Sequence, residues 1–293
     1  MEAGVSSMGL QLGTWMNPEN IARKPNNSLH FFQKYGERSV YQVPASCRLL
    51  ATSLRFRGPK VLRVSCSDSS SASLLEAGRF PAFFDDSKII KNKSEEVEPY
   101  LHGRCIYLVG MMGSGKTTIG KVLAEALGYS FYDCDKMIEE AVGGRTVAEI
   151  FKSYGEKFFR DNETEVLHEL SSMRRLVVST GGGAVIRPVN WRHMRKGVTV
   201  WLDVPLEALA QRITTVGTHS RPLLHHESGD PYSKTMKRLS ALFEERGEAY
   251  ANADVRVSLQ NIAAKLGYED VCNITPTAIA LEVLVQLENF LKN

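Results

Sequence analysis

The chain has 293 residues, enough for one or two domains, and 43% of them are hydrophobic and 24% charged, as in ordinary soluble proteins. The 36 basic and 33 acidic residues nearly balance, so the charge gives no global case for nucleic acid as a partner. No apolar run approaches the ~20 residues that a helix needs to span a bilayer, which predicts a soluble protein with no membrane partner.

The first 66 residues differ in composition from the rest of the chain. Basic residues outnumber acidic ones up to Cys66, Ser and Asn are frequent, and no helical or strand periodicity is sustained. This composition is typical of an organelle transit peptide, and a generic disordered tail is the alternative. We expect residues 1–66 to be a disordered transit peptide that takes no part in the fold.

Residues 67–99 are predicted to be a linker, because they contain a serine cluster at 69–71 and a run of mixed charge from Asp85 to Glu98. The folded domain is therefore expected over residues 100–293.

The domain is organised around the segment from Gly110 to Thr117, which fits the phosphate-loop pattern G-x-x-x-x-G-K-[ST] at every fixed position. An apolar stretch at 104–109 predicts a buried strand before it, and helical spacing at 118–127 predicts a helix after it. Glycines let main-chain N–H groups turn toward a polyphosphate at the positive end of that helix. A simple glycine-rich turn is the alternative. The predicted nucleotide-binding residues of the loop are Gly110, Met111, Met112, Gly113, Ser114, Gly115, Lys116, Thr117 and Thr118.

Two side chains of the loop have expected chemical roles. Lys116 would reach the β- and γ-phosphates, and the Thr117 hydroxyl would join the coordination of Mg²⁺. The loop therefore predicts a nucleotide and a magnesium ion, but it does not name the acceptor.

Apolar strands and amphipathic helices alternate through the rest of the domain. This alternation predicts an α/β fold, a three-layer P-loop NTPase-type parallel sheet with helices on both faces and ligands at the carboxyl ends of the strands. A weakly periodic stretch at 214–230 is expected to be a mobile loop. The predicted strands lie at 129–132, 176–180, 198–202 and 253–257, and the predicted helices at 137–142, 146–154, 156–170, 205–213, 232–250 and 279–290.

Asp133 and Asp135 close the predicted second strand, with both side chains on the same side of an extended chain. Beside a phosphate loop, one carboxylate could organise Mg²⁺ through water while the other accepts a proton from an attacking hydroxyl. A solvated turn, or an N-cap of the next helix, is the alternative.

Arg160 and a run of three glycines are candidates for the acceptor site. An arginine can hold an anionic substrate by two parallel hydrogen bonds, and Glu163 could hold its guanidinium in place; an exposed ion pair is the alternative. Gly181, Gly182 and Gly183 follow an apolar strand and would let a ligand lie directly on the backbone, where the alternative is a tight turn.

Three further arginines lie at a helix end, inside the predicted loop and late in the charged helix. Arg212 could stack on the base, Arg221 could brace the phosphates when the loop closes, and Arg246 could bind the anion of the acceptor. A single arginine at any of these places is usually surface charge.

Taken together and in order, six motifs between about Gly103 and the C-terminus resemble those of shikimate kinase. The basic leader makes the whole similar to a plant plastid-targeted member, which implies the plastid stroma as its location and the plastid import machinery as a partner. The motifs are Gly-Met-Met-Gly-Ser-Gly-Lys-Thr-Thr, Asp-Cys-Asp, Gly-Glu-Lys-Phe-Phe-Arg-Asp-Asn-Glu, Gly-Gly-Gly-Ala-Val, Arg-Pro-Leu-Leu and Glu-Glu-Arg-Gly-Glu-Ala-Tyr.

The resemblance implies phosphorylation of the 3-hydroxyl of shikimate by ATP, giving shikimate 3-phosphate and ADP in aromatic amino acid biosynthesis. By this resemblance the residues divide into shikimate, nucleotide and metal groups. Asp135 would be the base, Arg160 and Arg246 the carboxylate clamp, Gly181 to Gly183 the lining of the ring, Lys116 and Arg221 the groups that neutralise developing charge, Arg212 the adenine neighbour, and Thr117 with Asp133 the metal site.

The chain departs from the family pattern in two places. Pro276 is the candidate for the family's proline beside the base, but the stretch 255–274 before it diverges, and Ser179 stands where most P-loop kinases carry an acid. Two rivals remain: a kinase for another small polyol or a nucleotide monophosphate, and a non-catalytic nucleotide-binding regulator. Every position with an expected chemical role is filled, which argues against the second.

Overall fold

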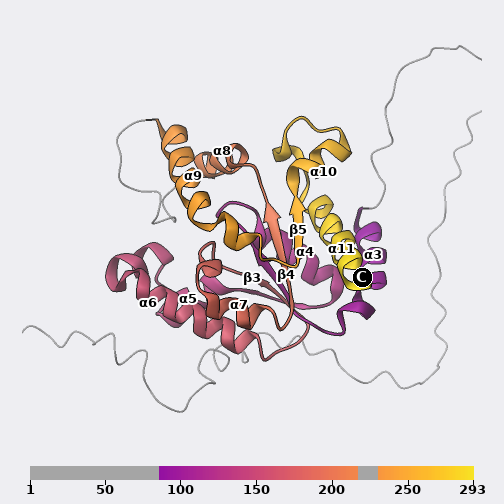
Figure 1. Cartoon of the computed structure of the whole chain (residues 1–293), viewed down its shortest axis with the longest axis horizontal. Coiled ribbons are helices and arrows are strands. Elements are labelled where there is room, and N and C mark those ends of the chain that lie inside the picture. The colour runs from indigo at the N-terminus through magenta and orange to yellow at the C-terminus, as the bar shows by residue number, and fades with distance from the viewer. Residues whose placement is uncertain (1–85, 217–229) are drawn as a thin grey trace, which may run out of the picture. The chain divides into compact units, whose positions relative to one another are not determined.

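The computed structural model describes residues 86–216 and 230–293 of the chain (Figure 1). The predicted leader, Arg221 and most of the predicted mobile loop lie outside the described residues. Within them, five parallel strands form one sheet in the order β2-β3-β1-β4-β5. The strands are β1 Ile106–Val109, β2 Ser130–Asp133, β3 Leu176–Ser179, β4 Val198–Asp203 and β5 Val255–Ser258.

The centre of the sheet is the centre of the hydrophobic core. All residues of β1 and β3 are buried, and so are all of β4 except Asp203, because helices cover both faces of these strands. The edge strand β2 has no buried residue, and β5 alternates buried and exposed positions. The predicted α/β class with a parallel sheet is therefore confirmed.

The helices lie on both faces of the sheet. Figure 1 shows α3, α4 and α11 on one side and α6, α7, α8 and α9 on the other. The α-helices are α3 Asp86–Leu101, α4 Lys116–Leu127, α5 Cys134–Ala141, α6 Val147–Leu170, α7 Pro188–Met194, α8 Leu206–Val216, α9 Pro231–Tyr250, α10 Leu259–Leu266 and α11 Pro276–Lys292, with short 3₁₀ helices η1 Ala184–Ile186 and η3 Val271–Asn273.

Helix α3 occupies the last part of the segment that the sequence predicts as a linker. Its apolar residues Ile90, Val97 and Leu101 are buried, and it packs against α11 and α4. The apolar residues of α3 are few and lie among charged ones, so the amphipathic pattern is weak. The helix therefore depends on tertiary packing for its stability. The structure thus contains an element that the sequence reading did not predict.

Helix α6 carries the two helical segments that the sequence predicts, at 146–154 and 156–170. Gly155, with φ 82° and ψ 165°, breaks the helical path between them. The first segment begins with the predicted capping box, in which Thr146 and Glu149 satisfy each other's backbone N–H groups. In contrast, α7 and α10 were not predicted. Among the described residues, no helix has the length and apolar character that crossing a bilayer requires.

Candidate active site

The phosphate loop joins β1 to α4 through glycines that no other residue could replace. Gly110 has φ 144°, and a Cβ there would lie 2.7 Å from the carbonyl oxygen of Leu202. Gly115, with φ 91°, is the N-cap of α4, so the loop ends at the positive end of that helix. Backbone N–H groups at the N-terminus of a helix can donate hydrogen bonds to an anion. A loop with this geometry can hold the phosphates of a nucleotide.

The Lys116 ammonium lies over this loop. Its Nζ donates hydrogen bonds to the carbonyl oxygens of Gly110 at 2.8 Å and Met111 at 2.9 Å, and the side chain is buried. A buried cation held by neutral carbonyl groups can move onto phosphate oxygens at little cost, because charge-assisted bonds are the stronger ones.

Thr117 and Asp133 lie together, as the predicted metal site requires. Thr117 Oγ1 donates to Asp133 Oδ2 at 2.7 Å and lies 3.4 Å from Ser179 Oγ. Oxygen ligands that include a single carboxylate suit Mg²⁺, which keeps several waters and takes further oxygens from substrate phosphates. The residues present therefore fit this ion, and the Ser179 hydroxyl lies beside them.

The sequence predicts that Asp133 and Asp135 share one face of an extended strand, and this prediction is wrong. β2 ends at Asp133, which is the N-cap of α5 and accepts a hydrogen bond from the Lys136 backbone N–H at 3.3 Å; Asp135 lies in the first turn of α5. The two-residue spacing fits a cap followed by a helical turn equally well, and the N-cap alternative is correct for Asp133.

Asp135 points into a buried cluster of charged groups. Its Oδ1 is shielded from solvent and lacks a hydrogen-bond partner among the described residues. Burial raises its pKa to about 7, with Glu163 and Asp133 adding to the rise and Lys116 and Arg160 opposing it. A carboxylate with its pKa near 7 is suited to take a proton from a hydroxyl at neutral pH.

Arg160 is the cationic centre of this cluster. Its Nη1 donates to Glu163 at 2.9 Å, and its Nε and Nη2 donate to one oxygen of Glu156 at 3.3 and 3.1 Å. Glu163 is fully buried and its Oε1 has no partner within the described part of the chain. The exposed ion pair that was the alternative for Arg160 is therefore excluded.

Two of the three glycines, Gly181 and Gly183, are required by the space that the cluster occupies. None has a positive φ, but a Cβ on Gly181 would lie 2.8 Å from Asp135 Oδ1, and one on Gly183 would overlap the Arg160 guanidinium. The backbone of Gly182 faces the phosphate loop, with Met112 N 3.4 Å from where a Cβ would be. The glycine run thus touches both the charged cluster and the nucleotide loop.

Helix α9 adds Arg246 and a tyrosine that the sequence reading did not single out. Arg246 is 3% exposed, and its Nε makes no hydrogen bond to any described residue. One turn later, the Tyr250 hydroxyl donates to the Gly182 carbonyl oxygen at 2.5 Å. The only sequence signal for Tyr250 is its place four residues after Arg246 at the end of a quoted motif.

The remaining predicted residues lie elsewhere. Arg212 is on α8, where its Nη2 donates to the Val271 carbonyl oxygen at 3.3 Å and the next residue, Ile213, packs on Gly113. It therefore lies near the phosphate loop, between that loop and η3. Pro276 is the first residue of α11, directly after η3. Arg221 is not among the described residues.

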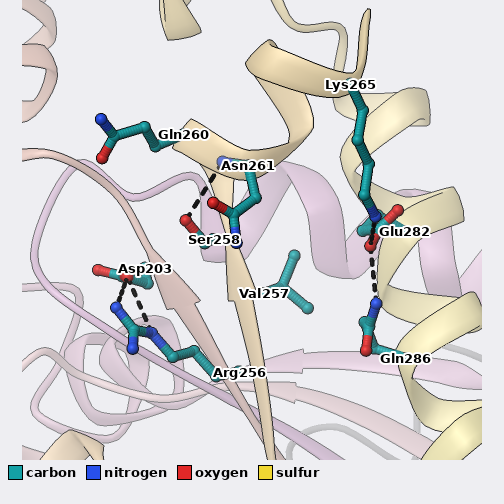
Figure 2. A pocket seen from close by; sticks show the side chains of 9 residues that line it. All are labelled: Asp203, Arg256, Val257, Ser258, Gln260, Asn261, Lys265, Glu282 and Gln286. Carbon is teal, nitrogen blue, oxygen red and sulfur yellow. Dashed lines mark hydrogen bonds and ion pairs between the residues drawn. The ribbon is translucent and has the colours of Figure 1, made fainter.

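A polar pocket of about 340 Å³ lies at the ends of β4 and β5, beside α10 and α11 (Figure 2). Its charges are paired within the chain. Arg256 donates to Asp203 at 2.6 Å, and Lys265 donates to Glu282 at 2.7 Å. None of the predicted site residues lines it, so the pocket is distinct from the candidate site.

The geometry places the phosphate loop beside a buried cluster of acids and arginines. Thr117 donates a hydrogen bond to Asp133, and the open side of Gly182 faces the backbone of the loop at Met112. Such a site can hold a polyphosphate and a hydroxylated anion side by side, which is the arrangement that phosphoryl transfer needs.

Comparison with known proteins agrees with this chemistry. Residues 112–287 match the family model described as shikimate kinase. The chain is 63% identical to the chloroplastic shikimate kinase of Solanum lycopersicum over 100% of its own length and 97% of the relative's, and 52% identical to shikimate kinase 1, chloroplastic, of Arabidopsis thaliana over 100% and 96%.

A solved structure of shikimate kinase from Acinetobacter baumannii in complex with shikimate is also similar. It is 35% identical, has a TM-score of 0.54, and is matched over 96% of its length by 65% of this chain.

Proposed function

The chain belongs to the shikimate kinase family, and from this premise we propose that the buried cluster beside the phosphate loop is its shikimate site. The enzyme transfers the γ-phosphoryl group of ATP to the 3-hydroxyl of shikimate, giving shikimate 3-phosphate and ADP for aromatic amino acid biosynthesis in the chloroplast. The roles of individual residues, the metal and the leader are the subject of the proposal.

The donor half of the site holds ATP. The loop backbone from Gly110 to Gly115 receives the phosphates, and Lys116 leaves its two carbonyl partners to bind the β- and γ-phosphate oxygens. Arg212, which donates a hydrogen bond to Val271 in η3, lies beside the base. Arg221, which is not among the described residues, braces the phosphates. Thr118 continues the first turn of α4 next to the phosphates.

Thr117 and Asp133 would hold Mg²⁺, with Ser179 close enough to join through its hydroxyl. When bound, this ion neutralises phosphate charge and orients the transferring group. The Thr117 hydroxyl, which here donates to Asp133, would turn its oxygen to the ion while the Asp133 carboxylate holds a water.

The acceptor half binds shikimate by its carboxylate and its ring hydroxyls. Arg160 and Arg246 clamp the carboxylate, and the backbone of Gly181 to Gly183 lies along the ring. Asp135 accepts the proton of the 3-hydroxyl as the oxygen attacks phosphorus. Because its pKa is about 7, a large fraction of the Asp135 carboxyl groups is ionised at neutral pH and can accept the proton, and the protonated form is also stable enough to hold it.

The observation that carries this proposal is that Asp135, Glu163 and Arg246 each bury a polar atom that no described residue satisfies. Buried unsatisfied groups are costly, so proteins keep them where a ligand completes them. Asp135 and Glu163 lie against Gly181, and Arg246 is close enough to Glu163 to oppose the rise in its pKa. The missing partners are those that a carboxylate and a hydroxyl group would supply.

The test is a coupled assay of ADP release by the protein from which residues 1–66 have been removed. We expect ADP release that depends on shikimate, and little with gluconate or a nucleoside monophosphate in its place. Equal release with another acceptor would favour the rival polyol or nucleotide kinase. ATP binding without acceptor-dependent release would favour the non-catalytic rival.

We also propose that residues 1–66 direct import into the chloroplast and that the compact domain begins at α3, near residue 86, instead of at residue 100. The buried face of α3 supports this boundary. A fluorescent reporter fused to residues 1–66 should enter chloroplasts, and a diffuse cytosolic signal would overturn the assignment of the leader.

A further inference from the structure

Tyr250 is a buried side chain that the mechanism above does not use. Its hydroxyl donates to the Gly182 carbonyl oxygen at 2.5 Å and lies 3.5 Å from Met111 Sδ. Gly182 belongs to the acceptor half of the site and Met111 to the phosphate loop. One hydroxyl group therefore lies at the point where the two halves meet.

The ring of Tyr250 is held firmly in that place. It stacks on Trp201 with ring centroids 5.9 Å apart and an interplanar angle of 17°. The Arg256 guanidinium lies over the same indole ring at 4.8 Å, and Asp203 holds that guanidinium by two hydrogen bonds. The phenol is thus supported by β4 and β5, outside both substrate sites.

The hydrogen bond at the Gly182 carbonyl group affects where the glycine run lies relative to the phosphate loop. The glycine run has no side chain that could fix its position, and the open side of Gly182 faces the backbone of Met112, whose nitrogen lies 3.4 Å from where a Cβ would be. The carbonyl groups of Gly181 and Gly183 accept backbone hydrogen bonds from Ala184 and Ile186, and the rigid phenol holds the carbonyl group between them. Without the phenol hydroxyl, the Gly182 peptide could shift relative to the phosphate loop.

We propose that Tyr250 is a positioning residue, whose hydroxyl fixes the distance between the glycine run that lines the shikimate ring and the loop that holds ATP. This inference rests on the proposed function. Phosphoryl transfer requires the attacking and leaving oxygens to be in line, and a misplacement of about 1 Å can cost on the order of a hundredfold in rate. Burial raises the pKa of Tyr250, so its hydroxyl remains a donor throughout the working pH range.

The test compares Tyr250→Phe with a control that loses a buried hydroxyl elsewhere. Tyr250→Phe keeps the ring and its stacking and removes the hydroxyl, which donates to the Gly182 carbonyl oxygen and also interacts with Met111 Sδ and Arg246. Ser94→Ala is the control, because Ser94 is 1% exposed and its hydroxyl donates to Ala126 at 2.7 Å on the α3 and α4 side. Both variants should lose similar stability.

We expect kcat of Tyr250→Phe to fall by about tenfold or more, while KM for ATP and for shikimate stay within about threefold of wild type. Ser94→Ala should keep the wild-type kcat at a temperature well below its Tm. An unchanged kcat in Tyr250→Phe, a rise in the shikimate KM alone, or a loss of activity that Ser94→Ala reproduces would each overturn the proposal. The wild type must first show shikimate-dependent ADP release, whose absence would instead refute the proposed function.

Discussion

Two polar regions lie at the carboxyl edge of the same sheet, and they differ in how their charges are satisfied. In the acceptor cluster beside β1 and β3, Asp135, Glu163 and Arg246 each bury an atom without a hydrogen-bond partner among the described residues. In the pocket at the ends of β4 and β5, the Asp203–Arg256 and Lys265–Glu282 pairs are complete (Figure 2).

The difference teaches where a ligand is needed. A pocket whose charges already pair with one another gains little when a charged ligand enters, because existing hydrogen bonds must break first. A cluster that hides unpaired atoms gains much, because a buried unsatisfied polar group costs about 1–3 kcal/mol. The presence of a hollow is therefore a weaker sign of function than unpaired, converging polar groups.

The largest expected effect comes from removing the lysine of the phosphate loop. Lys116→Met should lower kcat by about a hundredfold to a thousandfold, because this ammonium stabilises charge that develops on the phosphoryl group. The matched control is Lys265→Met in the paired pocket, which should keep kcat within about twofold. Steady-state ADP release measures both, and a comparable loss in the control would remove the distinction between the two regions.

A change at the carboxylate clamp should act on shikimate alone. Arg160→Lys keeps the charge but loses the planar fork, so the shikimate KM should rise about tenfold or more while the KM for ATP stays near wild type. Arg256→Lys makes the same exchange in the paired pocket and should leave both KM values unchanged. If Arg160→Lys bound shikimate normally, the clamp assignment would be wrong.

A third kind of site shows that an unpaired atom alone is not enough. Glu169 on α6 is 8% exposed and its Oε2 lacks a partner, yet it lies away from both regions. Burial, together with Glu165, raises its pKa to about 7 from 4.5. Because the folded state binds this proton more tightly than the unfolded state, wild-type stability falls as the pH rises from about 4.5 through 7.

Glu169→Gln should therefore be more stable than wild type at pH 8, by up to about 3 kcal/mol, and nearly equal to it at pH 4.5 or below. Urea unfolding at the two pH values measures the difference. If the difference in the free energy of unfolding between Glu169→Gln and wild type were the same at both pH values, the carboxyl group would titrate normally in the folded protein.

The smallest expected effect is at the paired pocket itself. Asp203→Asn removes the partner of the exposed Arg256 guanidinium and should cost about 1 kcal/mol or less in the free energy of unfolding, with no change in KM for either substrate. Thermal unfolding and the ADP assay check this. A marked rise in KM would mean that this pocket takes part in substrate binding after all.

The sequence predicted the parts of the molecule that local patterns determine. The strand, loop and helix from Ile106 to Leu127 follow from one motif, and the capping box at Thr146 follows from a four-residue pattern. The ion pair between Arg160 and Glu163 also follows from their spacing on a helix. These features depend on neighbours in the chain.

What the sequence could not predict depends on distant partners. Tyr250 acts on a carbonyl group 68 residues away, and nothing in its local pattern indicates that contact. Helix α3 is hidden among charges because its stability comes from packing on α11. Asp135 was placed on a strand because a two-residue spacing fits both an extended chain and the start of a helix.

The most direct test of the account is a crystal structure of the enzyme with shikimate. We predict that the carboxylate of shikimate accepts hydrogen bonds from Arg160 and Arg246, and that its 3-hydroxyl lies within hydrogen-bonding distance of Asp135, facing Lys116. Shikimate bound in the Asp203–Arg256 pocket, or in the cluster with its carboxylate turned away from both arginines, would contradict the account.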